Sequence, residues 1–374
     1  MQRKDGPVST QPVTPVFVIG YPNSGTTLLQ KMLGRHTLMH PTVSETYFFE
    51  FPYLYEERYP SLDTADRFAG FARFCANLLT HGFWDLYVHH TATEDPAILS
   101  DVEIHRLRAD LPRVPSHAQV FGAVGDRLAH RDGKAYWLEK SPAHAYHAVS
   151  ILSALPAAKC IEIVRDPRDI MASKKLRRGV HVKGLRSGGL SDHDRRHLGM
   201  TEYDPLWVSL AWKRTVAAVD SAHEAFPGRV LSVRYEDLVE RPQETVERLC
   251  ESLGLPFEPP MLEVPRSNVA DRGKLWQDEG AGVVTSSLHR WRKTLSDAEV
   301  LLAQRFLRGE MKRYGYVLHR AGVLPRYTGL LLIGCSFANL LTRLYRKTRH
   351  QGWAHTRRMI ALYARRGIEL ATGK

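Results

Sequence analysis

The hydrophobic pattern near the start of the chain changes its period within a few residues. Residues 16–19 form an unbroken run of β-branched and aromatic side chains, typical of a buried strand. From residue 28 onward, apolar side chains recur three and four positions apart, as on one face of a helix. Gly20 and Gly25 lie between the two patterns. We therefore predict a strand, a tight turn and a helix whose free N–H groups bind an anion.

Strand and helix patterns return further along the chain. We predict strands at residues 135–138, 160–164 and 229–235. We predict helices at residues 205–226, 243–253 and 299–316, and another that starts at Pro142. Residues 53–115 carry aromatic side chains at helical spacing and predict a helical insertion. Such an insertion would lie over the carboxyl ends of the strands, where open α/β sheets bind ligands. Residues 177–203 lack apolar periodicity and predict a mobile loop.

The composition fits an ordinary globular protein of the cytoplasm. The 374 residues, 43% of them hydrophobic and 25% charged, suffice for one large α/β domain with appendages or for two domains. The four cysteines lie far apart, so they indicate neither a metal site nor a disulfide framework. Residues 1–14 lack the apolar stretch of a signal peptide, and we expect a flexible arm there.

The net charge of +12 belongs mostly to the end of the chain. Residues 325–374 hold ten Lys and Arg and one acidic residue, so this tail carries +9 and leaves +3 for the rest. We therefore expect no nucleic-acid partner. Apolar side chains repeat at helical spacing over residues 337–345 with basic ones between them, which predicts a basic amphipathic helix. This helix could bind an anionic membrane, pack on the body of the protein or pair with a second subunit, and these alternatives stay open.

The first turn is nearly a Walker A loop. Gly20, Gly25 and Thr27 keep the spacing, but Thr26 stands where a nucleoside triphosphatase has its lysine. This argues against a nucleotide kinase, which stays an alternative. The motif Y-P-N-S-G-T-T resembles the 5'-phosphosulfate loop of the sulfotransferases that use 3'-phosphoadenosine 5'-phosphosulfate (PAPS). The resemblance implies that the donor is bound by Tyr21, Pro22, Asn23, Ser24, Gly25, Thr26 and Thr27.

Three later segments resemble the same family. In V-R-D-P-R-D-I-M-A-S, the resemblance implies that Arg165 and Ser173 hold the 3'-phosphate, and a guanidinium suits phosphate through paired hydrogen bonds. An ion pair between Arg165 and Asp169 is the alternative. The resemblance also places Tyr235 near the adenine, and Arg290 and Trp291 near the phosphosulfate.

The resemblance also assigns catalytic roles. S-E-T resembles the context of the catalytic glutamate in tyrosylprotein sulfotransferases, so Glu45 is the expected general base, with Glu50 as runner-up. Lys140, in E-K-S-P, would stabilise charge on the transferred group, or is an ordinary surface lysine. The family usually has a basic residue where this chain has Asn23, whose amide carries no charge. Lys140 and Arg290 are the candidates to supply that cation.

The resemblance covers residues 16–50 and 136–316 and implies the family's α/β fold, a P-loop-like, mostly parallel sheet flanked by helices, in a domain spanning residues 15–324. We expect a metal-independent, bacterial-type sulfotransferase that moves a sulfonate from PAPS to a hydroxyl of a small molecule, lipid or glycan. The product would be 3'-phosphoadenosine 5'-phosphate. The basic tail favours a lipophilic acceptor reached at a membrane surface. A catalytically inactive membrane or scaffold protein with the same fold is the other alternative.

Overall fold

Five strands form one parallel sheet in the order β2-β3-β1-β4-β5. The first strand, β1 (Thr14–Gly20), lies in the middle, between β3 (Tyr136–Lys140) and β4 (Lys159–Val164). The edges are β2 (Met39–Pro41) and β5 (Val230–Arg234). In the computed structural model, the residues described are 13–88, 90, 92–186, 203–264, 283, 285–320, 322, 327–329, 331–336 and 338. The expected α/β fold with a mostly parallel sheet is confirmed.

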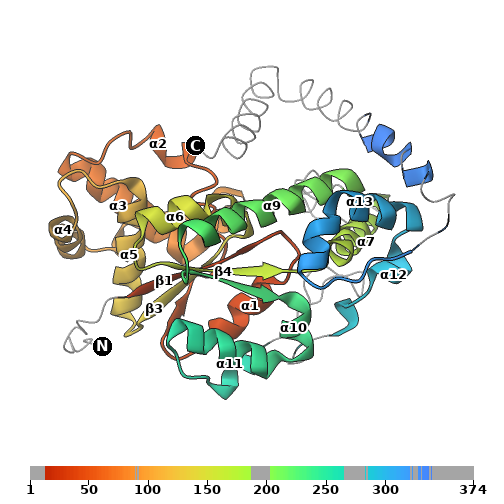
Figure 1. Cartoon of the computed structure of the whole chain (residues 1–374). Helices are drawn as coiled ribbons and strands as arrows, with labels where there is room; N and C mark the ends of the chain where they lie inside the picture. Colours follow the sequence, from red (N-terminus) through yellow and green to blue (C-terminus); the bar gives the residue numbers. More distant parts are fainter. Residues whose placement is uncertain are drawn as a thin grey trace. The chain divides into compact units, whose positions relative to one another are not determined.

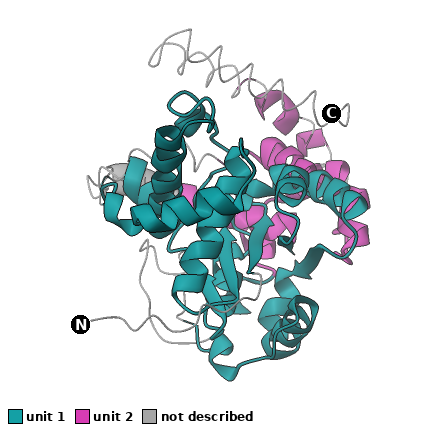
Figure 2. Cartoon of the chain, turned by 90° about the vertical axis from the view of Figure 1, so that its left-hand side faces the viewer, with its two compact units in different colours: residues 1–165, 180–197, 215–288 teal, residues 166–179, 198–214, 289–374 magenta. Residues whose placement is uncertain are grey.

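The residues fall into two units, coloured teal and magenta in Figure 2. The first comprises residues 1–165, 180–197 and 215–288, and includes the whole sheet. The second comprises residues 166–179, 198–214 and 289–374.

Side chains of β1 point alternately to the two faces of the sheet, and those on both faces are buried. Phe17 and Ile19 pack on one face, and Val16 and Val18 on the other, all with no exposed surface. In Figure 1, α3, α5 and α6 lie on the Phe17 side, while α1, α10 and α11 lie on the Val16 side. These helices are α1 (Thr26–Leu33), α3 (Ala65–Phe83), α5 (His117–Arg131), α6 (Ala148–Ala154), α10 (Tyr235–Glu240) and α11 (Pro242–Leu253).

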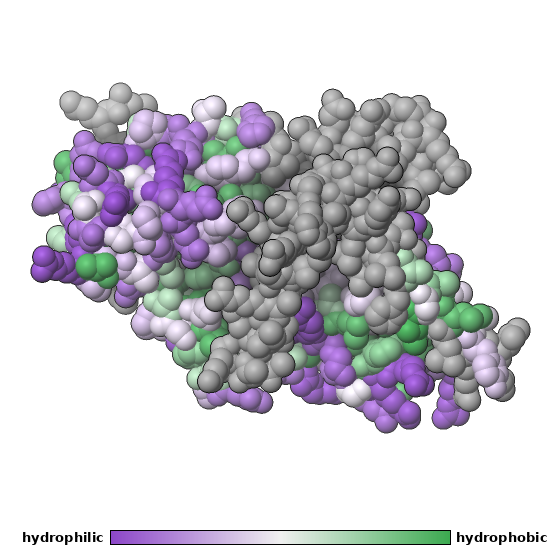
Figure 3. Space-filling model, turned by 90° about the horizontal axis from the view of Figure 1, so that it is seen from above, coloured by the Kyte–Doolittle hydropathy of each residue, from purple (hydrophilic) through white to green (hydrophobic). Residues whose placement is uncertain are grey.

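The long connection between β2 and β3 is helical, and its helix α5 lies beyond residues 53–115, where the insertion was expected. Besides α3 and α5 it holds α2 (Tyr53–Glu56), the π-helical turn η1 (Trp84–Val88), η2 (Pro96–Ile98) and α4 (Asp101–Asp110). Ser100 and Ser116 begin α4 and α5 with capping boxes, which satisfy N–H groups that a helix start leaves free. Hydrophilic residues predominate on the outer surface of these helices (Figure 3, left).

The second unit is built from helical segments. Its residues come from α7 (Pro167–Arg186) and α9 (Pro205–Ala225), both shared with the first unit, and from α12 (Trp291–Thr294) and α13 (Asp297–Arg313). Ala172, Trp291 and Val300 form its described apolar cluster.

The structure differs from the loop expected at residues 177–203. Helix α7 continues to Arg186, ten residues into that segment. No proline occurs between Pro167 and Pro205, so nothing in the sequence forces the helix to end earlier. The remainder of the expected loop, residues 187–202, lies outside the described residues.

Most of the predicted tail helix, with its apolar stripe and basic residues, also lies outside the described residues. None of the helices in the described part of the chain has the length and apolar content needed to cross a membrane.

The strand register brings four chain segments to one edge of the sheet. Val18 pairs with Lys140, Gly20 pairs with Ile163, and Val164 pairs with Arg234. Because the strands are parallel, their carboxyl ends share this edge. The segments that follow β1, β3, β4 and β5 therefore begin side by side.

Substitution of Gly20 tests how tightly the end of β1 packs against β4. Its φ is +144°, and a Cβ would lie 2.6 Å from the carbonyl oxygen of Ile163. We expect Gly20→Ala to lower the free energy of unfolding, measured in urea, by roughly 1–3 kcal/mol through overpacking, beyond the backbone cost. Gly228→Ala is the matched control, since Gly228 has φ +78° and nothing within 4 Å. Equal losses in the two variants would show that the contact with Ile163 is unimportant.

Candidate active site

The loop between β1 and α1 is held closely against α10. Gly25 precedes α1 with φ 99°, in the left-handed region that favours glycine. A Cβ at Gly25 would lie 2.3 Å from the ring of Tyr235. The second glycine of the motif is therefore required by both its backbone conformation and its neighbour.

Asn23 also lies in the left-handed region, with φ 72°. Among residues other than glycine, asparagine adopts this conformation most readily. Its carbonyl oxygen accepts a hydrogen bond from Arg165 Nη1 at 3.0 Å. The backbone conformation thus gives a physical reason for asparagine at this position.

Arg165 connects the loop to two other segments. Its Nη2 donates to the carbonyl oxygen of Ser287 at 2.8 Å, and its guanidinium stacks 4.3 Å from the ring centre of Tyr235. The Tyr235 hydroxyl and Ser287 Oγ are hydrogen-bonded at 2.6 Å. Asp169, the alternative partner expected for Arg165, accepts hydrogen bonds from the backbone N–H groups of residues 289 and 291.

Two polar atoms near this loop have no protein partner among the described residues. Ser24 Oγ and Arg165 Nε are both buried and without a hydrogen bond. A buried polar group without a partner costs free energy unless a ligand or water satisfies it. Together with the free N–H groups that begin α1, these atoms fit an anionic ligand. Thr26 is buried, whereas Pro22 and Thr27 are exposed.

Glu45 is surrounded by hydrogen-bond donors. Its Oε1 lies 2.5 Å from Lys140 Nζ, and the side chains are only 18% and 8% exposed. Its Oε2 accepts from the Tyr47 hydroxyl and, at 3.1 Å, from Trp84 Nε1. The two residues expected to be catalytic, Glu45 and Lys140, thus form one ion pair at the end of β3.

These contacts set the ionisation of Glu45. Burial alone would raise the pKa of its carboxyl, but Lys140, Tyr47 and Trp84 together hold this pKa below the ordinary value. Burial, together with the charge of Glu45, raises the pKa of Tyr47 well above its usual range. Glu45 is therefore a carboxylate, and Tyr47 a neutral donor.

A second carboxylate, Glu139, supports this pair from within the sheet. Glu139 is fully buried, and its Oε1 accepts from the Thr46 backbone N–H (3.2 Å), Thr46 Oγ1 (2.8 Å) and Ser141 Oγ (2.5 Å). Its Oε2 lies 3.0 Å from His144 Nδ1. Because His144 Nε2 accepts from the Phe49 N–H, we assign the imidazole proton to Nδ1. Burial would raise the pKa of Glu139, but His144, Ser141 and Thr46 together lower it.

This network fixes the loop that carries Glu45. Ser141 Oγ accepts from the backbone N–H groups of Thr46 and Tyr47, both at 3.1 Å. Tyr47 has φ 51°, which is uncommon for an aromatic residue and costs of order 1–3 kcal/mol. The hydrogen bonds from Glu139 through Ser141 hold Tyr47 in this conformation.

The helical insertion also contacts the same loop. Gly82, with φ 78°, interrupts the helical geometry of α3, and a Cβ there would lie 2.4 Å from Cβ of Ser44. The chain then turns so that the Phe83 N–H donates to the carbonyl oxygen of Glu45 at 2.8 Å. This turn brings the Trp84 indole to the Glu45 carboxylate.

Ser173, Arg290 and Trp291 belong to the second unit. Asp169 accepts from the N–H groups of His289 and Trp291, both at 2.9 Å, and so fixes the backbone on either side of Arg290. Trp291 is a core side chain of this unit, 3% exposed and stacked against Arg168 at 4.2 Å.

The sequence of this molecule matches a known family over most of the described site. The model of the family described as "Sulfotransferase family" matches residues 15–259, a span that includes the loop, Glu45, Lys140 and Arg165. The chain belongs to the sulfotransferase family.

The individual proteins that this chain resembles are distant from it in sequence. An uncharacterized protein of Aquifex aeolicus (strain VF5) is 24% identical over 280 residues, which are 75% of this chain and 30% of that protein. The chain thus spans about a third of that relative's length. The sulfotransferase domain from the curacin biosynthetic pathway is 20% identical with a TM-score of 0.46, covering 83% of this chain and all of that one. The sulfotransferase domain from the Synechococcus PCC 7002 olefin synthase is also 20% identical, with a TM-score of 0.42 and coverage of 82% and 97%.

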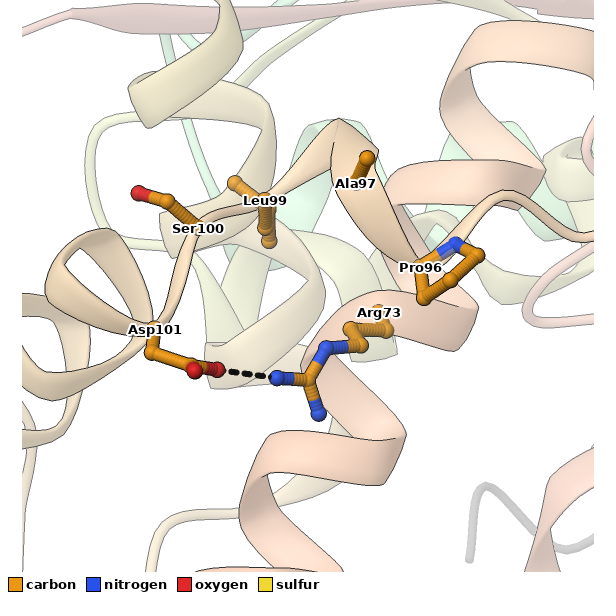
Figure 4. Close-up of a pocket in the computed structure, with 6 residues that line it drawn as sticks. All are labelled: Arg73, Pro96, Ala97, Leu99, Ser100 and Asp101. Atoms are coloured by element: carbon orange, nitrogen blue, oxygen red, sulfur yellow. Dashed lines mark hydrogen bonds and ion pairs between the residues drawn. The ribbon is translucent and has the colours of Figure 1, made fainter.

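A surface hollow of about 530 Å³ lies elsewhere, in the helical insertion (Figure 4). The ion pair between Arg73 and Asp101 crosses it, so these charges already have partners. None of the predicted site residues lines the hollow, whose walls are Arg73, Pro96, Ala97, Leu99, Ser100 and Asp101.

Sequence reasoning missed Tyr47, Trp84 and Glu139. Trp84 is 39 residues from Glu45, and Glu139 is 93 residues from Thr46, so no local motif joins them. A signal for Glu139 was nonetheless present, because a charged residue inside an apolar strand is rarely buried without partners.

Glu139 leads to a prediction about stability and pH. A carboxyl whose pKa is lowered by folding stabilises the fold above its unfolded pKa, and this contribution is lost as the pH falls through the folded pKa. We expect Glu139→Gln to lower the free energy of unfolding by roughly 3 kcal/mol at pH 7, because it breaks a buried charged network. The difference from wild type should shrink as the pH is lowered below about 5.

Urea denaturation at pH 7 and at several acidic values measures this difference. Glu244→Gln serves as the control, because Glu244 forms an exposed pair with Arg241 at 3.4 Å and should cost less than about 1 kcal/mol at pH 7. A loss for Glu139→Gln that is the same at every pH would contradict the ionised state assigned to Glu139.

Proposed function

We propose that this protein transfers a sulfonate group from PAPS to the hydroxyl of an acceptor, with Glu45 as general base. The observation that carries the proposal is the ion pair of Glu45 and Lys140 at the end of β3. Strand β3 lies next to β1, whose end begins the anion-binding loop. A base and a cation are thus fixed at the edge of the sheet that also holds this loop.

The loop supports PAPS as the donor. Its helix start, Ser24 Oγ and Arg165 Nε offer hydrogen-bond donors to an anion, and Thr26 replaces the lysine needed for a triphosphate. When bound, PAPS supplies the sulfonate on a phosphate leaving group. Arg165 keeps the loop in place through Asn23 and is proposed to meet the 3'-phosphate. The donor roles of Ser173, Tyr235, Arg290 and Trp291 stay predictions.

Glu45 and Lys140 divide the chemistry between them. Glu45 takes the proton of the acceptor hydroxyl while the acceptor oxygen forms its bond to sulfur. The bond between sulfur and the bridging oxygen breaks, and its electron pair stays on the phosphate of 3'-phosphoadenosine 5'-phosphate. Lys140 places a positive charge where negative charge develops, a role that the neutral Asn23 amide does not fill.

The surroundings of Glu45 support an acceptor with an apolar body. Tyr47 contacts Phe51, Phe83 and Trp84, with ring centres 5.4, 5.5 and 5.7 Å apart. Aromatic rings beside the base favour a phenol or a lipophilic alcohol over a glycan. Contact of the basic tail with an anionic membrane or a second subunit, and a cytoplasmic location, stay predictions of the sequence.

Transfer of radiolabelled sulfonate from PAPS to phenols, aliphatic alcohols and glycans tests the proposal. We expect Glu45→Gln to lower the turnover rate by roughly 10²- to 10⁴-fold, because a general base is lost. Its affinity for PAPS should not fall, since the loop and Arg165, and not this carboxylate, are proposed to hold the donor.

Glu50→Gln is the matched comparison, because Glu50 is the other candidate base and lies 3.0 Å from His147 Nε2. Full activity of Glu45→Gln, with a large loss for Glu50→Gln, would assign the base to Glu50 instead. Absence of transfer to every acceptor class by wild type that binds PAPS would favour a non-catalytic role.

A further inference from the structure

Three hydrogen-bond donors contact the Glu45 carboxylate, whose side chain is 18% exposed. Lys140 binds Oε1, while Tyr47 and Trp84 both donate to Oε2. Three donors stabilise the charged form of a carboxylate and make it a weak base. In the free protein, Glu45 is therefore a weak base toward the hydroxyl of an acceptor.

The donors on Oε2 are fixed in place. The ring of Tyr47 stacks on Phe51 and meets Trp84 edge-on, and its backbone N–H is held by Ser141. The Trp84 ring also packs against Phe83 at 5.4 Å. These contacts keep the hydroxyl and the indole N–H on Glu45.

Lys140 is different. Its ammonium group is on a flexible four-carbon stem, and its described polar partner is the Glu45 carboxylate. An ammonium group binds any nearby anion, with little demand on geometry. Lys140 is therefore the donor that can leave Glu45 when another anion is offered.

We propose that Lys140 alternates between two partners, the Glu45 carboxylate in the free enzyme and the sulfonate of the donor in the loaded enzyme, so that Glu45 becomes a base only when the donor is present. The inference rests on the proposed function, because it uses the same base and the same donor. Under this inference Lys140 sets the order of the reaction, because the donor must bind before Glu45 can take the proton of the acceptor.

The exchange changes the charges that face Glu45. Among the described residues, the ionisable groups in contact with its carboxylate are Lys140 from β3 and Tyr47 from its own loop, and η1 contributes the neutral indole of Trp84. When Lys140 leaves, burial still disfavours the carboxylate and only neutral donors oppose it. The pKa of Glu45 then rises, and the protein takes up protons as the donor binds.

Calorimetric titration of the full-length protein with PAPS, without acceptor, measures this uptake. Titrations between pH 5.5 and 8, in buffers with different ionisation enthalpies, give the number of protons bound per PAPS. Because the phosphates of PAPS also titrate, the informative quantity is the difference between wild type and Glu45→Gln. We expect wild type to take up more protons than Glu45→Gln, with a difference that grows toward about one proton as the pH falls.

Two further variants make the result specific. Lys140→Met should also lose the extra uptake, because its Glu45 lacks the cation before PAPS binds. Glu50→Gln should keep the extra uptake, since Glu50 pairs with His147 and not with Lys140. If Glu45→Gln does not fold, the comparison of wild type with Lys140→Met gives the same answer.

The outcomes separate the inference from the function it rests on. Equal proton uptake in wild type and Glu45→Gln, with PAPS bound tightly by both, would overturn the alternation of Lys140 and leave the proposed function intact. Failure of wild type to bind PAPS would overturn both.

Discussion

The site depends on the parallel pairing of β1 with a strand on each side. This pairing aligns the carboxyl ends of β1, β3 and β4, and so brings the loop from Gly20, the side chain of Lys140 and that of Arg165 to one edge. Burial of β1 on both faces leaves little room for this arrangement to shift. The chemistry is therefore carried by short segments that follow rigid strands, as is general for open parallel sheets.

A buried carboxylate links this scaffold to the catalytic loop. Glu139 belongs to β3, yet its hydrogen bonds reach Thr46 directly and Tyr47 through Ser141. Burying a charge is costly unless it is paired and hydrogen-bonded, and here four donors contact the carboxylate, three on Oε1 and one on Oε2. The same contacts maintain the unusual backbone conformation of Tyr47 beside Glu45. Strain of this kind persists where surrounding structure enforces it, which is common at functional sites.

Sequence patterns predicted the local structure well, but they predicted few of the contacts between distant residues. The loop, the strands β1, β3, β4 and β5 and the parallel sheet follow from apolar runs, glycines and the family resemblance. Glu45 and Lys140 were each predicted, but their ion pair joins positions 95 residues apart and needs the fold to bring them together. The partners Trp84 and Glu139 were missed for the same reason, whereas Tyr47 was missed although it is only two residues from Glu45. The end of α7 was misplaced because a polar, glycine-containing segment can continue a helix where no proline stops it.

The central claim is that the edge of the sheet holds a nucleotide with a 3'-phosphate and a short 5' anionic chain, and no triphosphate. Calorimetric titration of the full-length protein with adenosine 3',5'-bisphosphate and with magnesium ATP tests it most directly. The account predicts that the bisphosphate binds at least about tenfold more tightly, a difference of roughly 1.4 kcal/mol or more. Tighter binding of magnesium ATP would contradict it and point to a nucleotide kinase.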